Sequence, residues 1–309
     1  MYHAFLEQLH TVITQGSFTM DEPMSKHTSF SIGGPADLFV EPANVKEIQK
    51  LCALVKEKEI PFFVLGNGSN LLVSDDGIRG LVMHLGKNFS QIDVKDDIIS
   101  IQAGAPLSRV ARVALSESLG GFEFAAGIPG SFGGAVAMNA GAYGGEMKDI
   151  LLDVDVLTPE GQIIRLSAEE LDLSYRHSII FEKNYIVLEA RIRLLPADPQ
   201  QIKARMDELA LARKTKQPLE YPSAGSTFKR PEGYFAGKLI QDAGLKGYTV
   251  GGAMVSEKHA GFVINHGQAT AEEVVFLIRQ VQKKIEKQFG VHMEPEVRLI
   301  GFDPSSDLS

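Results

Sequence analysis

The sequence predicts an α+β protein, and three observations lead to that class. A strand–helix–strand unit opens the pattern between residues 36 and 65. Short strand patterns separated by turn residues follow as far as residue 194, and long helical patterns dominate the remainder. The length of 309 residues exceeds the size at which one hydrophobic core stops growing. We therefore expect two or three domains.

The first elements are helical and then irregular. We expect an amphipathic helix at the N-terminus and an irregular segment from its end to about residue 30. A strand follows at 36–40. The next helix, at 44–58, begins with Asn44 as its N-cap and has Glu47 three residues on. A strand at 61–65 completes the strand–helix–strand unit.

The middle of the chain is rich in strands. One helix interrupts them at 106–119, where a Pro lies in the first turn and Gly120 follows the last apolar position. The turn at 159–161 joins two strands as a hairpin. The expected strands are 78–85, 98–102, 151–157, 163–166 and 185–194.

A change of composition near residue 196 marks the best domain boundary. Two Pro residues introduce a charged helix that ends near Lys216. At 291–300 apolar and charged residues alternate, which predicts a strand with Glu296 and Arg298 on its polar face. In between we expect a loop at 221–230, a short helix at 235–243, a strand at 261–265 and a helix at 271–289.

Composition excludes several classes of protein. Hydrophobic residues make up 44% and charged residues 23%, which excludes disorder as the main state, and a net charge of −8 argues against general nucleic-acid affinity. Cys52 is the single cysteine and lies among apolar residues at helical spacing, so we expect no disulfide framework and no thiolate metal cage. The eight histidines show no metal-ligand spacing. Because the sequence shows neither a signal-peptide pattern nor an apolar stretch long enough to cross a membrane, we expect a cytoplasmic protein.

Two glycine-rich segments are the most informative feature of the chain. Residues 120–145 interleave glycines with Phe, Ile, Val and Met, which favour burial, so we expect neither a flexible linker nor a regular helix or strand. Gly66-Asn67-Gly68-Ser69-Asn70 follows an apolar run in the same way. Main chain with so few side chains indicates that N–H groups face a large cofactor, which the two segments would contact from two sides. The alternative is that the fold itself requires tight turns at these glycines. Neither segment is a GxGxxG fingerprint or a P-loop.

The polar residues that could carry a reaction are few, and each of them has more than one interpretation. Arg176, next to Tyr175, is either a clamp for a carboxylate or phosphate or part of a surface turn. Ser226 follows a Gly in a loop but lies in no GxSxG nucleophile elbow. Glu294 and Glu296 are either a carboxylate pair or solvated strand charges.

Motifs in the same order over nearly the whole chain resemble those of the UDP-N-acetylenolpyruvoylglucosamine reductase family, MurB. They include both glycine-rich segments and the surroundings of the polar residues above. The motifs are Gly66-Asn67-Gly68-Ser69-Asn70-Leu71-Leu72, Ala126-Gly127-Ile128-Pro129-Gly130-Ser131-Phe132-Gly133-Gly134, Asn139-Ala140-Gly141-Ala142-Tyr143-Gly144, Tyr175-Arg176, Ala224-Gly225-Ser226, Gly237-Lys238-Leu239-Ile240 and Glu294-Pro295-Glu296-Val297-Arg298.

The resemblance implies a fold and a division into domains. It implies an FAD-binding domain of the type shared by p-cresol methylhydroxylase (PCMH) and vanillyl-alcohol oxidase, made of two lobes over about 33–197. A C-terminal α+β substrate domain would follow. By this resemblance the lobes are 1–68 and 69–197, with the long glycine-rich loop in the second, and the substrate-binding domain is 198–309.

The resemblance also implies an activity. Members bind FAD noncovalently, take hydride from NADPH, and reduce the enolpyruvyl ether of UDP-N-acetylglucosamine-enolpyruvate to UDP-N-acetylmuramate. This product is a peptidoglycan precursor, so the reaction serves cell-wall biogenesis, cell shape and cell division. The implied partner is a UDP-sugar, with no nucleic acid, membrane or obligate protein partner. A FAD oxidase of the same fold with another substrate, and a non-catalytic flavin- or sugar-nucleotide-binding module, are the alternatives.

Site residues follow from motif position alone. Ser226 would donate a proton to the substrate carbon, and Arg176 and Glu296 would act at the enol carboxylate. The compact stretch from Arg176 to Ser226 lacks room for the Tyr-bearing insertion of longer members, so the chain resembles the shorter type. The implied substrate-binding residues are Tyr175, Lys216 and Lys229, the lysines at phosphates of the nucleotide ligands. The implied cofactor-binding residues are Gly66, Asn67, Gly68, Ser69, Asn70, Leu71, Gly127, Ile128, Pro129, Gly130, Ser131, Gly133, Gly134, Asn139, Gly141, Ala142, Tyr143 and Gly144.

Overall fold

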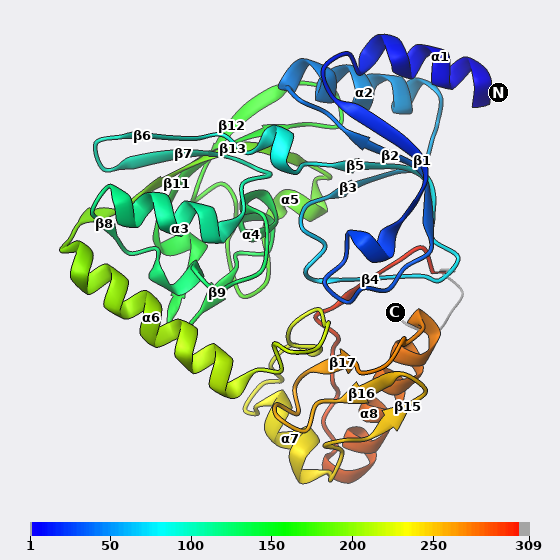
Figure 1. The fold of residues 1–309 in the computed structure, drawn as a ribbon, viewed down its shortest axis with the longest axis vertical. Coiled ribbons are helices and arrows are strands. Elements are labelled where there is room, and N and C mark those ends of the chain that lie inside the picture. Colours follow the sequence, from blue (N-terminus) through cyan, green and yellow to red (C-terminus); the bar gives the residue numbers. More distant parts are fainter. Residues whose placement is uncertain (1, 303–309) are drawn as a thin grey trace. The chain divides into compact units, whose positions relative to one another are not determined.

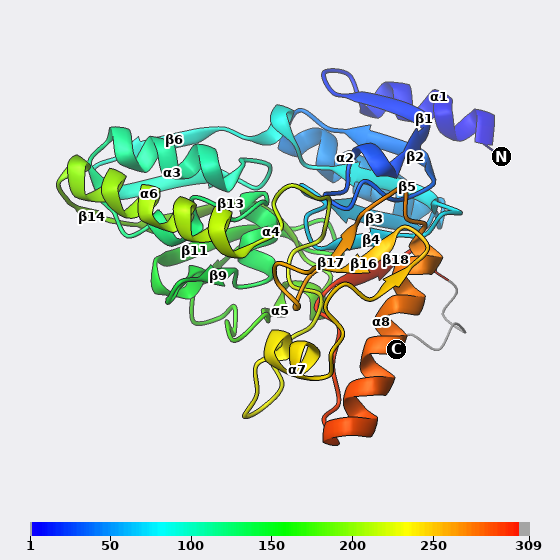
Figure 2. The same cartoon turned by 60° about the horizontal axis from the view of Figure 1, so that its bottom comes forward.

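The computed structural model describes residues 2–302, and the chain divides into two compact units. Each unit is assembled from separate stretches of sequence, and Figures 1 and 2 label their elements. The first unit comprises Met1–Thr19, Leu38–Asn67 and Gly80–Leu211, and the second Met20–Asp37, Gly68–Arg79 and Ala212–Ser309.

A five-stranded antiparallel sheet lies at the centre of the first unit. Its strand β13 (Ile186–Arg193) buries Leu188, Ala190 and Ile192, which are two residues apart and therefore face the same side of the sheet. These side chains join the core of the first unit, and helix α4 (Phe132–Ala137) contacts the same strand. The strand order is β12 (Ile163–Ser167), β11 (Leu151–Leu157), β13, β7 (Ile98–Gln102) and β6 (Ile92–Lys95).

A four-stranded sheet contains the strand–helix–strand unit that the sequence predicts. Helix α2 (Val45–Glu57) begins as expected, because the side chain of Asn44 accepts a hydrogen bond from the Glu47 N–H. Strand β3 (Phe62–Leu65) then pairs in parallel with β5 (Ile78–His84). The strand order is β1 (Ser17–Pro23), β2 (Pro35–Glu41), β5 and β3.

The second unit has its own core under a long helix. Helix α8 (Ala271–Phe289) begins with a capping box between Thr270 and Glu273 and ends at Gly290, whose φ of 65° is left-handed. Its buried face packs into the core of this unit. The sheets of this unit are β15 (Thr249–Val250), β16 (Ala253–Val255) and β17 (Val263–Asn265), and the parallel pair β4 (Leu71–Val73) and β18 (Arg298–Ile300).

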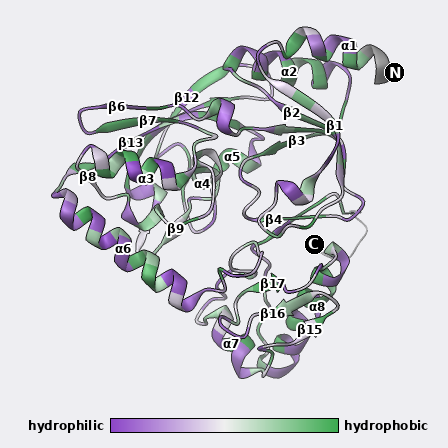
Figure 3. Cartoon of the chain, in the orientation of Figure 1, coloured by the Kyte–Doolittle hydropathy of each residue, from purple (hydrophilic) through white to green (hydrophobic). Residues whose placement is uncertain are grey.

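The remaining elements are mostly short. The predicted charged helix is α6 (Pro199–Lys216), along which Figure 3 shows hydrophilic and hydrophobic residues alternating. The other helices are α1 (Tyr2–Val12), α3 (Leu107–Ser116), α4 (Phe132–Ala137), α5 (Ile179–Glu182) and α7 (Ala236–Asp242), with single 3-10 turns at Met24–Lys26, Lys87–Phe89, Glu123–Ala125 and Met147–Asp149. The shortest strand pairs are β8 (Leu119–Gly120) with β14 (Leu195–Pro196), and β9 (Gly141–Ala142) with β10 (Gly145–Glu146).

The glycine-rich segment is more regular than the sequence predicts. We expected no helix in it, yet α4 begins at its N-cap Ser131, whose side chain accepts from the Gly134 N–H at 3.4 Å. Burial of Phe132 and Val136 in the first core stabilises this helix despite two glycines of low helix propensity. Tertiary packing therefore overrides local preference here.

The expected strand at 291–300 is wrong over most of its length. Only β18 is a strand, because it pairs with the three residues of β4, and Glu296 precedes it. Pro295 has no N–H to donate and makes only an isolated bridge to Phe228. Glu296 and Arg298 are consequently not two positions of one strand. The segment before residue 30, expected to be irregular, contains the strand β1.

Candidate active site

The two glycine-rich segments meet in the first unit at Gly66 and Ser131. A Cβ atom on Gly66 would lie 2.2 Å from Ser131 Oγ, which is far inside contact distance. Ser131 is itself buried, and it is the N-cap of α4. The structure thus brings together two motifs that lie sixty-five residues apart in the chain.

Several glycines of the long segment are required by the packing of the protein itself. A Cβ on Gly133 would lie 2.7 Å from Ala103 Cβ, and one on Gly141 would lie 2.8 Å from Glu146 Cβ. For these positions the tight-turn explanation is sufficient. Gly144 differs, since it is exposed, has a φ of 89°, and has nothing within 4 Å of a Cβ position.

Part of the main chain of the long glycine-rich segment is exposed and available to a cofactor. Gly127, Pro129, Gly134 and Gly144 are exposed, although the segment around them is anchored by buried side chains such as Phe132. Such a surface offers peptide groups with little side chain in front of them, which suits the phosphates and flat ring system of a dinucleotide cofactor. These residues therefore fit FAD.

Asn139 connects the glycine-rich segment to the turn that carries Arg176. It is 1% exposed and has a φ of 42°, an uncommon conformation that Asn tolerates better than most residues. Its Nδ2 donates to Glu146 Oε2 at 2.6 Å and to the Ser174 carbonyl oxygen at 3.0 Å. Its Oδ1 accepts from the Lys148 N–H at 3.0 Å.

Arg176 lies in a tight turn of the first unit. Ser174 and His177 exchange two backbone hydrogen bonds of 3.2 Å, and between them Arg176 has a left-handed φ of 57°. Its guanidinium carbon lies 5.2 Å from the centre of the exposed Tyr175 ring. A hydrogen bond from Lys148 is the largest cause that holds the pKa of Glu146 below its ordinary value, and the charge of Arg176 contributes.

The other end of the first motif belongs to the second unit. Gly68 has a φ of 57°, and a Cβ there would lie 2.0 Å from the His27 carbonyl oxygen. The Ser29 N–H donates to the Gly68 carbonyl oxygen at 3.2 Å. Residues 27–29 therefore lie against this motif, which no pattern quoted above predicts, although the Gly33-Gly34 pair before a strand was an available signal.

The segments that contain Ser226 and Glu296 lie side by side in the second unit, although they are far apart in the sequence. Ser226 is exposed and follows Gly225, whose φ is 78°. The Glu296 N–H donates to the carbonyl oxygen of Thr227 at 2.8 Å, which places Glu296 beside the residue after Ser226. The half-buried Asn70 joins this group, because its Nδ2 donates to the Glu296 carbonyl oxygen at 3.0 Å.

The two lysines of the predicted site lie in different surroundings. Lys229 is paired with Glu294, with 2.5 Å between Nζ and Oε1, so an incoming phosphate would have to compete with that carboxylate. Lys216 is exposed at the end of α6.

Arg298 is half-buried, and burial lowers the pKa of its guanidinium group below the ordinary value.

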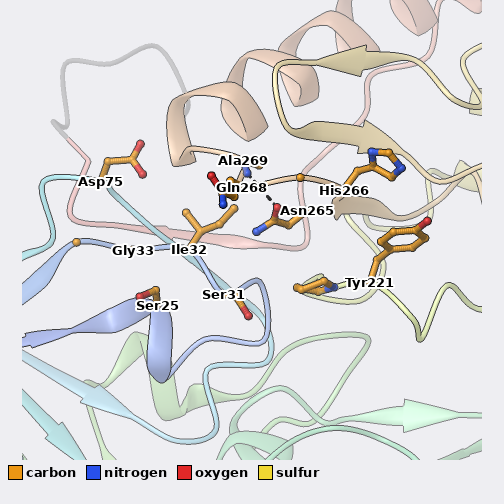
Figure 4. A pocket seen from close by; sticks show the side chains of 13 residues that line it. Ser25, Ser31, Ile32, Gly33, Asp75, Tyr221, Asn265, His266, Gln268 and Ala269 are labelled. Atoms are coloured by element: carbon orange, nitrogen blue, oxygen red, sulfur yellow. Dashed lines mark hydrogen bonds between the residues drawn. The ribbon is translucent and has the colours of Figure 1, made fainter.

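A separate cavity of about 650 Å³ lies within the second unit. Figure 4 shows Asp75 at one end and Tyr221 with His266 at the other, and these two rings are 5.3 Å apart. Ser226 and Glu296 do not line it, so we assign it no role in the chemistry.

Between residues 2 and 302 the structure contains no group of three metal-ligating side chains and no helix long and apolar enough to span a bilayer.

Comparison with known proteins agrees with this arrangement. Residues 36–167 match an FAD-binding domain family, and residues 217–300 match the C-terminal domain of UDP-N-acetylenolpyruvoylglucosamine reductase. These matches confirm the predicted combination of an FAD-binding domain with the C-terminal domain of that enzyme.

Full-length relatives extend the agreement over both units. The chain is 56% identical to the UDP-N-acetylenolpyruvoylglucosamine reductase of Agathobacter rectalis, over 97% of this chain and 99% of that protein. It is 52% identical to the reductase of Caldanaerobacter subterraneus, over 97% and 99%. The crystal structure of the Thermus caldophilus reductase aligns with a TM-score of 0.79 and 36% identity, covering 93% of this chain and 99% of that one. The chain therefore belongs to the UDP-N-acetylenolpyruvoylglucosamine reductase family, MurB.

Proposed function

We propose that this protein reduces the enolpyruvyl ether of UDP-N-acetylglucosamine-enolpyruvate to UDP-N-acetylmuramate, with NADPH as the source of hydride. The identity of 56% over 97% of the chain to a reductase of that name carries the proposal. The presence of Arg176, Ser226 and Glu296 at the positions that the motifs predict supports it. The protein is accordingly an FAD-dependent oxidoreductase of peptidoglycan precursor synthesis.

The FAD would be held by main chain of both glycine-rich motifs. FAD, when bound, supplies the hydride that NADPH has delivered to it. The exposed peptide groups of Gly127, Pro129, Gly134 and Gly144 would lie against its phosphates, while Gly66 and Asn67 continue the surface in the first unit. By motif position, Gly68, Ser69, Asn70 and Leu71 would also contact FAD.

Arg176 would bind the carboxylate of the enolpyruvyl group. Addition of hydride to one alkene carbon leaves negative charge on the neighbouring carbon and its carboxylate, so a cation there lowers the barrier. A guanidinium can form two parallel hydrogen bonds with a carboxylate and thereby fix its plane. The tight turn between Ser174 and His177 limits how far Arg176 can move.

Ser226 would deliver the proton that completes the reduction. The carbanion-like carbon is a strong base, so a hydroxyl group suffices as the acid once it is positioned. Ser226 is exposed, and the next residue, Thr227, is buried, which limits how far this part of the main chain can move.

Glu296 would orient the carboxylate end of the substrate or donate a hydrogen bond to it. Tyr175 would contact the substrate beside Arg176, and Lys216 and Lys229 would contact phosphates of the nucleotide ligands. We also propose that the lobes 1–68 and 69–197 bind FAD, that 198–309 binds the sugar nucleotide, and that the protein works in the cytoplasm.

Steady-state kinetics test the function. We expect NADPH oxidation by the yellow holoprotein to depend on the enolpyruvyl sugar and to yield little peroxide. Oxidation with stoichiometric peroxide and no dependence on the sugar would indicate an oxidase instead. Ligand binding without turnover would indicate a binding module.

A further inference from the structure

Thr227 is a buried and hydrogen-bonded residue directly after the predicted proton donor Ser226. Its side chain is 1% exposed, and Oγ1 accepts a hydrogen bond from the Val263 N–H at 2.8 Å. Its own N–H donates to the Gly261 carbonyl oxygen at 2.9 Å, and its carbonyl oxygen accepts from the Glu296 N–H at 2.8 Å. One residue therefore joins the Ser226 segment, β17 and the Glu296 segment.

The hydrogen bonds along β17 show an irregular ladder at Ser226. The Asn265 N–H donates to the Pro222 carbonyl oxygen at 2.9 Å, and Ser223 bridges Ile264 in antiparallel register. In a continuous ladder of that register, the Val263 N–H would donate to the carbonyl oxygen of Ala224. It donates to the Thr227 side chain instead.

The segment thus contains one extra residue relative to β17, as in a β-bulge. Between the bonds from Asn265 to Pro222 and from Thr227 to Gly261, the chain advances five positions on one segment and four on the other. Gly225 supplies the left-handed φ of 78° that the bulge requires. A bulge changes the direction in which a side chain points. Here that side chain belongs to the exposed Ser226, which lies between Gly225 and the hydrogen-bonded Thr227.

We propose that Thr227 is a positioning residue for proton transfer, and this rests on the proposed function. Its hydroxyl replaces the main-chain acceptor that the bulge removes from the Val263 N–H. Its backbone then fixes Ser226 on one side and Glu296 on the other. Without Oγ1, the buried N–H of Val263 lacks this acceptor and the bulge loses its register. Ser226 would keep its hydroxyl, but the hydroxyl would no longer be held in position to donate a proton to the substrate carbon.

The test compares the two half-reactions in Thr227→Val, which preserves shape and removes the acceptor. Displacement of a reacting group by about 1 Å can cost on the order of 100-fold, so we expect kcat for the enolpyruvyl sugar to fall by about 10–100-fold. We expect KM to change less, and reduction of the flavin by NADPH to keep its wild-type rate. Thr227→Ser keeps the acceptor and restores most of kcat.

A matched control separates positioning from stability. Thr158 is also a buried hydroxyl that accepts backbone N–H groups, from Glu160 and Gln162, but it lies in the hairpin turn between β11 and β12. Thr158→Val should lower the urea midpoint of unfolding without changing kcat. If Thr227→Val does not fold, Thr227→Ala removes the acceptor without placing a methyl group against the Val263 N–H.

Two results would overturn the proposal. One is a folded Thr227→Val or Thr227→Ala enzyme with wild-type kcat, and the other is an equal loss in both half-reactions. Wild-type protein that shows no sugar-dependent NADPH oxidation would instead refute the proposed function, before any variant is compared.

Discussion

The side-chain amide of Asn139 donates a hydrogen bond to the carbonyl oxygen of Ser174 at 3.0 Å. Asn139 lies in the glycine-rich segment directly after α4 and its C-cap Met138, and Ser174 opens the turn that carries Arg176. Within the first unit, the segment proposed to hold the cofactor and the residue proposed to bind the carboxylate therefore share one buried side chain. Damage to that side chain should affect both.

Replacement of Asn139 should separate backbone strain from lost hydrogen bonds. Asn139→Ala leaves the Ser174 carbonyl and the Lys148 N–H without this partner, for which we expect a loss of about 1–3 kcal/mol in the free energy of unfolding. Asn139→Gly loses the same bonds but adopts the φ of 42° without strain, so it should be about 1 kcal/mol more stable than the Ala variant. Urea unfolding and flavin content after gel filtration measure both effects. Equal stability of the two variants would contradict the idea that the left-handed φ of residue 139 strains a residue with a Cβ atom.

Gly66→Ala should weaken flavin binding through contact with Ser131. The added Cβ would lie 2.2 Å from Ser131 Oγ, so either the Gly66 turn or the N-terminus of α4 must move. In the double variant with Ser131→Ala that atom is gone and the nearest Ser131 atom is 3.3 Å away, so flavin binding should recover in part, less about 1 kcal/mol for the lost cap.

The matched control for Gly66 is Gly161→Ala in a hairpin turn of the same unit. Gly161 has a φ of 84° but nothing within 4 Å of its Cβ position, so the variant carries strain without a collision. Fluorescence titration of apoprotein with FAD should give a wild-type Kd for it. A weaker Kd in Gly161→Ala than in Gly66→Ala would refute the steric account.

Ser226→Ala should slow only the second half-reaction. Loss of a positioned acid costs at least about 100-fold, so we expect sugar reduction to fall by that factor. Bleaching of the flavin by NADPH should stay at the wild-type rate, because it needs no proton from Ser226. Stopped-flow absorbance follows the two steps separately, and an equal loss in both would assign Ser226 to binding or folding.

Glu47 should make stability depend on acid pH. Its buried carboxylate accepts the N–H groups of Thr14, Gln15, Gly16 and Ala43. Burial alone would raise the pKa, but these hydrogen bonds outweigh it and hold the pKa below the ordinary 4.5. Because the folded pKa is depressed, the carboxylate's contribution is present above 4.5 and is lost as pH falls through the folded value.

The variant that isolates this carboxylate is Glu47→Gln. At pH 7 we expect it to lose about 2–3 kcal/mol in the free energy of unfolding, since hydrogen bonds to a charged acceptor are replaced by weaker ones. The difference from wild type should shrink as the pH falls below 4.5. Urea unfolding at pH 7 and at pH 4 measures it, and a difference that grows toward low pH would show that the sign is wrong.

Local signals in the sequence predicted those parts of the fold that depend on neighbours in the chain. The Asn44 N-cap of α2 and the hairpin at Gly161 both appear where expected, because three- and four-residue patterns determine them. The strand expected at 291–300 failed because strand length depends on the partner β4, and alternation of apolar residues does not reveal how long that partner is.

Motif comparison predicted which site residues to look for, but the sequence does not contain their geometry. The α4 helix depends on burial of Phe132 against distant strands, and the bulge at Ser226 exists only relative to β17. The left-handed φ of Arg176 likewise depends on the turn between Ser174 and His177. These features arise from contacts between segments far apart in the chain.

The most direct test of the account is the product of a reaction that contains the purified protein, NADPH and UDP-N-acetylglucosamine-enolpyruvate. Mass spectrometry should show the substrate converted to a species that contains two additional hydrogen atoms. One NADPH should be consumed for each product molecule, and in deuterated water at least one of the two added hydrogens should be deuterium, as a solvent-exchanged hydroxyl donor requires. Consumption of NADPH that leaves the sugar nucleotide unchanged would contradict the account.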